Sequence, residues 1–182
     1  MKASIILSTY NRPQALLTVL EALNLQTIQD FEVCIADDGS TKDTQQIIEN
    51  FQQKSAFPIL HAWQDDRGFR AASARNNAVR MSSGDYLLFL DGDCIPRPNW
   101  IHQHLTLSEK HAFVAGNRVL LDETLSHAIE THRIPFTDLF GLNVLRHKDH
   151  INRLMPLLKI PLGSMRRLKP TSWAKVRTCN LV

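Results

Sequence analysis

The 182-residue sequence is poor in cysteine and contains no long apolar run. Its three cysteines, Cys34, Cys94 and Cys179, are widely spaced and form no Cys-x-x-Cys pair. This argues against a disulfide framework or a structural zinc site and favours a reducing compartment. No stretch approaches the roughly 20 apolar residues that a membrane-spanning helix needs, and residues 1–8 are too briefly apolar for a secretory signal. We therefore expect one cytoplasmic globular domain.

Net charge is also small, at +3, but it is unevenly distributed. Residues 146–177 carry a net charge of +8, which leaves −5 for the rest of the chain. The basic segment could contact phosphates or the anionic inner face of the plasma membrane, and apolar residues interleaved with the basic ones fit a membrane surface. A solvated helix surface explains the charges equally well. Because no nucleic-acid motif accompanies them, nucleic acid is not an expected partner.

Apolar runs alternate with helical patterns along the first half of the chain. The expected strands cover residues 4–8, 31–36, 58–63 and 86–90. One expected helix begins at Pro13, and two more cover residues 41–53 and 71–81. Asn11 is a candidate cap for the first helix. This alternation predicts an α/β fold with a mostly parallel sheet and helices on both faces.

Beyond Asp93 the pattern loosens. We expect a short helix over residues 96–107, a strand over 112–121 interrupted at Gly116, and helical spacing across 125–160. Trp100, within the first of these, is a candidate wall for a second substrate.

Polar clusters follow three of the expected strands, at residues 8–11, 37–40 and 91–93. Parallel α/β sheets bind ligands in the crevice outside the carboxyl ends of their strands. Three separate segments therefore converge on one edge, which predicts a binding site there.

Asp91-Gly92-Asp93 suggests the chemistry of that site. Two carboxylates held this close repel each other unless a cation lies between them. Mg²⁺ and Mn²⁺ suit carboxylate oxygens and fill their remaining positions with water and phosphate oxygens. The motif therefore favours a metal–diphosphate site, although a short acidic loop around a glycine can also be a simple turn.

Asp37 and Asp38 form a second acidic pair, on a Gly-Ser turn. Their carboxylates could accept hydrogen bonds from a base N–H or from ribose hydroxyls. The structural alternative is a helix cap with acids near the positive end of the helix dipole. Arg70 and Arg75 could add positive charge near phosphates.

Four motifs in order and register resemble family 2 glycosyltransferases, whose fold is called GT-A. They are Ser-Thr-Tyr-Asn-Arg at 8–12, Ala-Asp-Asp-Gly-Ser at 36–40, Gly-Phe-Arg-Ala-Ala-Ser-Ala-Arg-Asn at 68–76 and Leu-Asp-Gly-Asp at 90–93. The resemblance covers at least residues 3–121. It implies a Rossmann-like, nucleotide-sugar (donor) binding core over residues 1–121. A partial acceptor-side region, helical and basic, would then occupy residues 122–182.

The resemblance also implies roles for single residues. The implied donor-binding residues are Thr9, Tyr10, Arg12, Asp37, Asp38, Arg75 and Asp91. Asp38 matches the acid that binds the base, usually uracil, and Arg75 matches an arginine in the loop that closes over the donor. Asp93 matches the direct ligand of Mn²⁺ or Mg²⁺, and Asp91 belongs to the same metal motif but lies nearer the ribose.

The implied activity is metal-dependent transfer of a sugar from a UDP-sugar, with inversion, to a glycan or lipid-linked acceptor. Cell-surface polysaccharide or lipopolysaccharide synthesis would be the setting, with the protein in the cytoplasm or peripheral at the inner face of the plasma membrane. An acceptor hydroxyl attacks while a carboxylate removes its proton. A nucleotidyltransferase is less favoured, because residues 8–12 lack the glycine-rich phosphate loop expected after the first strand.

The sequence departs from the family at its carboxyl end. In the family the catalytic base follows a Cys-Asn-containing strand, which residues 178–182 resemble, and the sequence then stops. We therefore expect a chain truncated before its base, beyond Val182, with weak or no transfer. A donor-binding or membrane-docking remnant without turnover is the alternative. No base is assigned among the acids that follow Asp93, which are Glu109, Asp122, Glu123, Glu130, Asp138 and Asp149.

Overall fold

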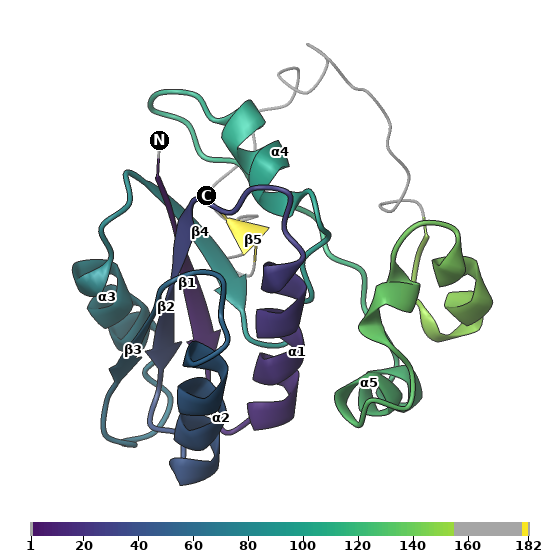
Figure 1. The fold of residues 1–182 in the computed structure, drawn as a ribbon, viewed down its shortest axis with the longest axis horizontal. Helices are drawn as coiled ribbons and strands as arrows, with labels where there is room; N and C mark the ends of the chain where they lie inside the picture. Colours follow the sequence, from purple (N-terminus) through teal and green to yellow (C-terminus); the bar gives the residue numbers. More distant parts are fainter. Residues whose placement is uncertain (1, 155–179, 182) are drawn as a thin grey trace.

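The structure, a computed structural model, describes residues 2–154 and 180–181. Its centre is a five-stranded sheet of order β3-β2-β1-β4-β5 (Figure 1). The strands are β1 (Ala3–Thr9), β2 (Phe31–Asp37), β3 (Ile59–Trp63), β4 (Tyr86–Asp91) and β5 (Asn180–Leu181). The first four pair in parallel, and β5 is antiparallel to β4. The α/β class and the mostly parallel sheet predicted from the sequence are confirmed.

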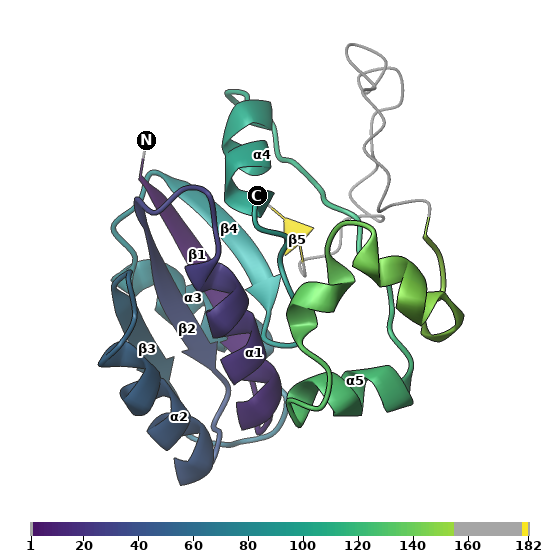
Figure 2. The same ribbon diagram turned by 45° about the vertical axis from the view of Figure 1, so that its right-hand side comes forward.

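Helices cover both faces of the sheet, as expected. The helices α1 (Pro13–Asn24) and α2 (Lys42–Gln52) lie on one face, and α3 (Ala71–Met81) lies on the other (Figures 1 and 2). Pro13 begins α1, where its missing N–H costs nothing. Asn11 does not cap this helix: its side chain instead accepts a hydrogen bond from the backbone N–H of Thr41, the residue before α2.

The two faces of the sheet are packed differently. Large apolar side chains such as Ile5, Leu7 and Phe31 face α1 and α2 and form the main core. The opposite face packs small side chains of β2, including Ala36, against Ala74 and Ala78 of α3. Because consecutive strand residues point to opposite faces, one apolar strand can serve both layers. The small side chains permit α3 to lie close to the sheet.

The second half of the chain adds shorter helices. They are α4 (Trp100–Leu107), α5 (Glu123–Glu130) and the 3₁₀ helices η1 (Phe136–Leu139) and η2 (Asn143–His150). A separate apolar cluster centred on Leu125, Ile129, Val144 and Ile151 holds α5 and η2 together. Figure 2 shows this group beside the start of α1. None of the helices in the described ranges has the length and hydrophobicity needed to cross a bilayer.

The strand expected over residues 112–121 is wrong. The structure assigns this stretch no named strand, only isolated bridge residues at Ala115 and at Leu121, which pairs with Ile151. The free edge of β4 pairs instead with β5. The helical spacing expected over 125–160 yields α5 and two 3₁₀ helices up to His150, and residues 155–160 lie outside the described residues. Pro135 lies between α5 and η1. Most of the basic segment at 146–177 lies outside the described residues.

A buried acid stabilises the amino-terminal edge of the sheet. Glu32 is 4% exposed and accepts hydrogen bonds from Ser4 Oγ at 2.6 Å, from the Ser83 hydroxyl at 2.9 Å and from Lys2 Nζ at 3.2 Å. Burial alone would raise its pKa, but these donors and the Ser83 N–H lower the pKa from 4.5 to about 2. The carboxylate therefore ties β1, β2 and the turn before β4 together in its charged form.

We predict that Glu32→Gln lowers the free energy of unfolding by about 2–3 kcal/mol, because the charged acceptor and its hydrogen bonds are lost. A depressed folded-state pKa means that the wild-type contribution is present above the ordinary value of 4.5 and disappears as the pH falls toward 2. Urea unfolding at pH 7 and at pH 3 measures both effects. The two proteins should differ less at pH 3.

The matched control is Glu49→Gln, an exposed glutamate on α2, which should change stability by less than about 0.5 kcal/mol. A Glu32→Gln protein as stable as wild type at pH 7 would contradict the assigned role.

Candidate functional site

The loops after β1, β2 and β4 are hydrogen-bonded to one another. The N–H of Gly92 donates to Ser8 O at 2.7 Å, and the N–H of Asp38 donates to Thr9 O at 3.2 Å. A Cβ atom at Gly92 would lie only 2.7 Å from Ser8 O, so glycine is required for this close approach. The structure thus brings the three polar clusters to one edge.

Asp91 is paired within the protein. Its Oδ1 accepts hydrogen bonds from Ser8 Oγ and from Arg75 Nη2, each at 2.9 Å. Arg75 projects from the first half of α3 and also donates to Ser8 Oγ at 3.0 Å. The two residues predicted for the site are therefore in direct contact, and the positive charge of Arg75 offsets one of the two motif carboxylates.

Asp93 is more open, with a side chain 52% exposed. Ligand atoms of Asp91, Asp93 and Cys94 all lie within 4.8 Å of one another, and the Cys94 thiol donates to Asp93 Oδ1 at 3.6 Å. Two carboxylates at this spacing suit a hard divalent cation. Nearby, Thr9 Oγ1 is buried at the loop contact and has no hydrogen-bond partner in the described structure. The residues present therefore fit a metal–phosphate site.

Arg12 stands on the other side of Asp93. Its Nη1 lies 3.7 Å from Asp93 Oδ2, while Nη2 is hydrogen-bonded to the carboxylate of Glu130, the last residue of α5. Glu130 was not predicted as a site residue. It is 118 positions from Arg12, and no local pattern in the sequence connects the two.

Asp37 has no exposed surface, and its carboxylate is engaged by the protein. Oδ1 accepts the N–H of Ser40 at 2.8 Å, and Oδ2 accepts from His61 Nε2 at 2.9 Å. Burial would raise the pKa of Asp37, but the hydrogen bonds from His61 and Ser40 lower it below its usual value. The carboxylate shapes the turn that leads into α2.

Asp38 is held from a different loop. Its carboxylate accepts from Gln64 Nε2 at 2.6 Å and from the backbone N–H of Arg70 at 2.7 Å, both in the segment between β3 and α3. The guanidinium of Arg70 is hydrogen-bonded to the carbonyl of Asp65 rather than to a motif carboxylate. Asp38 thus has a fixed orientation, and each oxygen keeps capacity to accept one more hydrogen bond.

An aromatic rim borders this edge. Tyr10 is 49% exposed and donates to Asp66 Oδ2 at 3.0 Å, a contact that raises the pKa of Tyr10. Gly39, with φ +98°, packs directly against the backbone of Asp66. Trp63 and Phe69, which were not predicted for the site, are also exposed in this region. Trp63 Nε1 donates to Ser40 O at 3.1 Å.

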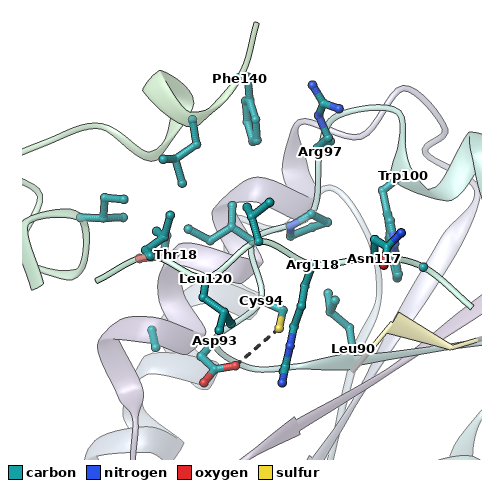
Figure 3. Close-up of a pocket in the computed structure, with 18 of the residues that line it drawn as sticks. Thr18, Leu90, Asp93, Cys94, Arg97, Trp100, Asn117, Arg118, Leu120 and Phe140 are labelled. Carbon is teal, nitrogen blue, oxygen red and sulfur yellow. Dashed lines mark hydrogen bonds between the residues drawn. The ribbon is translucent and has the colours of Figure 1, made fainter. Parts of the chain in front are cut away.

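A cavity of about 480 Å³ adjoins Asp93 (Figure 3). Its walls come from α1, the loop before α4, α4 itself, residues 114–121 and the end of α5. Trp100, the candidate wall, is one of the lining residues, together with Leu120 and Phe140. Arg12, Asp93 and Glu130 also line the cavity, so it meets the metal-binding edge directly. The arrangement can place a second molecule beside a ligand bound at the sheet edge.

Comparison with known proteins shows which family and which relatives this chain resembles. The family model described as Glycosyl transferase family 2 matches residues 4–169. Hyaluronan synthase of Pasteurella multocida is 37% identical over 122 residues, 65% of this chain and 12% of the synthase. Validoxylamine A glucosyltransferase of Streptomyces hygroscopicus subsp. jinggangensis is 36% identical over 120 residues, 65% of this chain and 27% of that protein. The chain therefore spans a minor part of the relatives it matches.

Solved structures share the fold. Staphylococcus aureus TarS 1-349, in complex with UDP-GlcNAc, aligns with a TM-score of 0.52 and 28% identity over 66% of this chain and 34% of that one. The mannosyltransferase PcManGT from Pyrobaculum calidifontis, in complex with GDP-Man and Mn²⁺, aligns with a TM-score of 0.57 and 20% identity over 64% of this chain and 35% of that one. The GT-A fold expected from the sequence is confirmed.

We predict that Asp37→Asn lowers the free energy of unfolding by about 1–3 kcal/mol, because a buried carboxylate that accepts two hydrogen bonds is replaced. Since its folded pKa is depressed, the wild-type advantage is present above the ordinary value near 3.8 and is lost as the pH falls below it. Denaturant unfolding at several pH values measures this.

Asp30→Asn, an exposed aspartate just before β2, is the control and should leave stability within about 0.5 kcal/mol of wild type. If both variants behaved alike, the scaffold role of Asp37 would be rejected.

Proposed function

Because the chain belongs to glycosyl transferase family 2, we propose that its sheet edge binds a UDP-sugar whose sugar is transferred to an acceptor hydroxyl. The observation that carries the proposal is the meeting of Asp91, Arg75 and Asp93 at one edge of the sheet, with Asp93 also lining the adjoining cavity. The likeness to TarS, a protein solved with UDP-GlcNAc, supports the choice of nucleotide.

The nucleoside would lie on the β1–β2 side of the edge. Asp38 is oriented by Gln64 and Arg70, which suits an acceptor of a base N–H. Tyr10 and Thr9 would border the nucleotide, with Tyr10 held by Asp66 and Thr9 Oγ1 able to donate to a phosphate oxygen. Asp37 would support this wall through Ser40 rather than contact the ligand.

The diphosphate would lie between Arg75 and Asp93. Mn²⁺ or Mg²⁺, held mainly by Asp93 with Asp91 beside it, would neutralise the diphosphate as the sugar leaves. Arg75 adds a fixed positive charge, because Asp91 and Ser8 hold its guanidinium. Arg12 supplies a second positive charge on the cavity side.

The reaction we propose is a single displacement with inversion. The acceptor hydroxyl oxygen forms a bond to the anomeric carbon while the bond from that carbon to the diphosphate oxygen breaks, and the hydroxyl proton passes to a base. We assign no base among the described residues. The cavity lined by Trp100 is the proposed binding site of the acceptor. Holding the acceptor hydroxyl in a fixed orientation would contribute to the rate.

The proposed acceptor is a glycan or a lipid-linked glycan of cell-surface polysaccharide or lipopolysaccharide synthesis. The proposed location is the cytoplasm, with residues 146–177 contacting the anionic inner face of the plasma membrane. The support is the net charge of +8 in that segment and its interleaved apolar residues. The proposed division into a donor core over 1–121 and an acceptor-side region over 122–182 follows the family resemblance.

We predict that UDP binds the chain in the presence of Mn²⁺ and that Asp93→Asn weakens this binding by at least about tenfold, because a direct metal ligand is lost. Isothermal titration calorimetry with and without Mn²⁺ measures it. Asp85→Asn, an exposed aspartate at the opposite end of β4, is the matched control and should bind UDP like wild type.

Equal UDP affinity with and without Mn²⁺ would reject metal dependence, and no UDP binding by the folded chain would reject the donor site. Binding without sugar transfer to any acceptor would favour the remnant without turnover.

A further inference from the structure

Each aspartate of the metal motif has an arginine partner, and the two pairs differ in strength. Arg75 is hydrogen-bonded to Asp91 at 2.9 Å, with side chains 21% and 29% exposed. Arg12 lies 3.7 Å from Asp93, and both of these side chains are 52% exposed. The second pair is therefore long and solvent-screened. The carboxylate of Asp93 is therefore more available to another cation than that of Asp91.

Arg12 has a second acidic partner, Glu130. Its carboxylate is hydrogen-bonded to Nη2 of Arg12, while Nη1 of the same guanidinium faces Asp93. The guanidinium is thus shared between an acid of the sheet edge and an acid of α5.

The position of Glu130 is set by α5 rather than by Arg12. Leu125 and Ile129 bury one face of this helix, and Asp122 caps its start by accepting the N–H of Leu125 at 2.9 Å. Asp122 also contacts His150 Nδ1 at 2.7 Å, which ties the start of the helix to η2. Arg12 has a long, half-exposed side chain. Of the two partners, Glu130 is therefore the fixed one and Arg12 the one that can shift.

We propose that Glu130 is a positioning residue for the metal site: it holds the guanidinium of Arg12 away from Asp93 and so leaves that carboxylate available to a divalent cation. The inference rests on the proposed donor site. Without Glu130, Arg12 can form a closer, bidentate ion pair with Asp93. A divalent cation would then have to displace it. With Glu130 present, Arg12 keeps a partner when the cation arrives and stays beside the diphosphate.

A purely structural role for the pair predicts something different. If the contact only fastened α5 to the start of α1, Glu130→Gln would lower stability and leave the affinity for a metal unchanged. If Glu130 acted only as a general negative charge near the site, its removal would weaken metal binding whether or not Arg12 was present.

The test is a double-mutant cycle with Mn²⁺ alone as the probe, measured on the whole chain by the electron paramagnetic resonance signal of free Mn²⁺. Glu130→Gln should weaken Mn²⁺ binding about two- to fivefold, the range expected for a half-exposed ion pair. Arg12→Ala should tighten it by a similar factor. Adding Glu130→Gln to Arg12→Ala should change nothing further. Glu123→Gln, an exposed acid on the same helix, is the control and should bind like wild type.

Unchanged or tighter Mn²⁺ binding by Glu130→Gln overturns the inference, as does equal weakening in the Arg12→Ala background. If Glu130→Gln does not fold by circular dichroism, Glu130→Asp replaces it and should weaken binding by a smaller factor. Failure of wild type itself to bind Mn²⁺ would reject the proposed metal site and this inference with it, whereas normal binding without the Arg12 dependence rejects the inference alone.

Discussion

The site depends on β1 being paired in parallel with both of its neighbours. The register places Thr9 opposite Asp37 on one side and Ser8 opposite Asp91 on the other. The acids that end β2 and β4 therefore reach the same edge within one residue step of each other. A slip of one residue in either pairing would turn the acid to the opposite face of the sheet. Gly92 fixes this alignment, because its N–H reaches the end of β1 where no side chain could fit.

The acids of this chain show how surroundings decide what a carboxylate does. Glu32 and Asp37 are buried and surrounded by donors, so their charge stabilises the fold at opposite ends of β2. Asp93 is half exposed and only loosely paired, so its charge is available to a ligand. Asp91 lies between these extremes, bonded to Arg75 but partly exposed. Side-chain chemistry is the same in each case; burial and the number of donors differ.

Features set by local pattern were predictable from the sequence, and features set by distant contacts were not. The four parallel strands, the helices on both faces and the convergence of three polar clusters on one sheet edge follow from alternation, spacing and motif order. The strand expected at 112–121 was wrong, because backbone pairing there is limited to isolated bridge residues, and the apolar pattern of the stretch does not encode whether a partner strand lies beside it. The contact of Glu130 with Arg12 depends on how α5 packs, which no short-range pattern in the sequence encodes. The engagement of Asp37 by His61 likewise depends on the pairing of β2 with β3.

The alanine-lined contact between α3 and the sheet limits how this chain can vary. Ala74 and Ala78 are fully buried against small side chains of β2, and Arg75 extends from the same helix. A bulkier side chain at either alanine would wedge the helix outward and withdraw the guanidinium from Asp91. The size of the side chains packed between α3 and the sheet thus determines where the positive charge of Arg75 lies at the sheet edge. Drift at these two positions should be confined to small residues even though neither one touches a ligand.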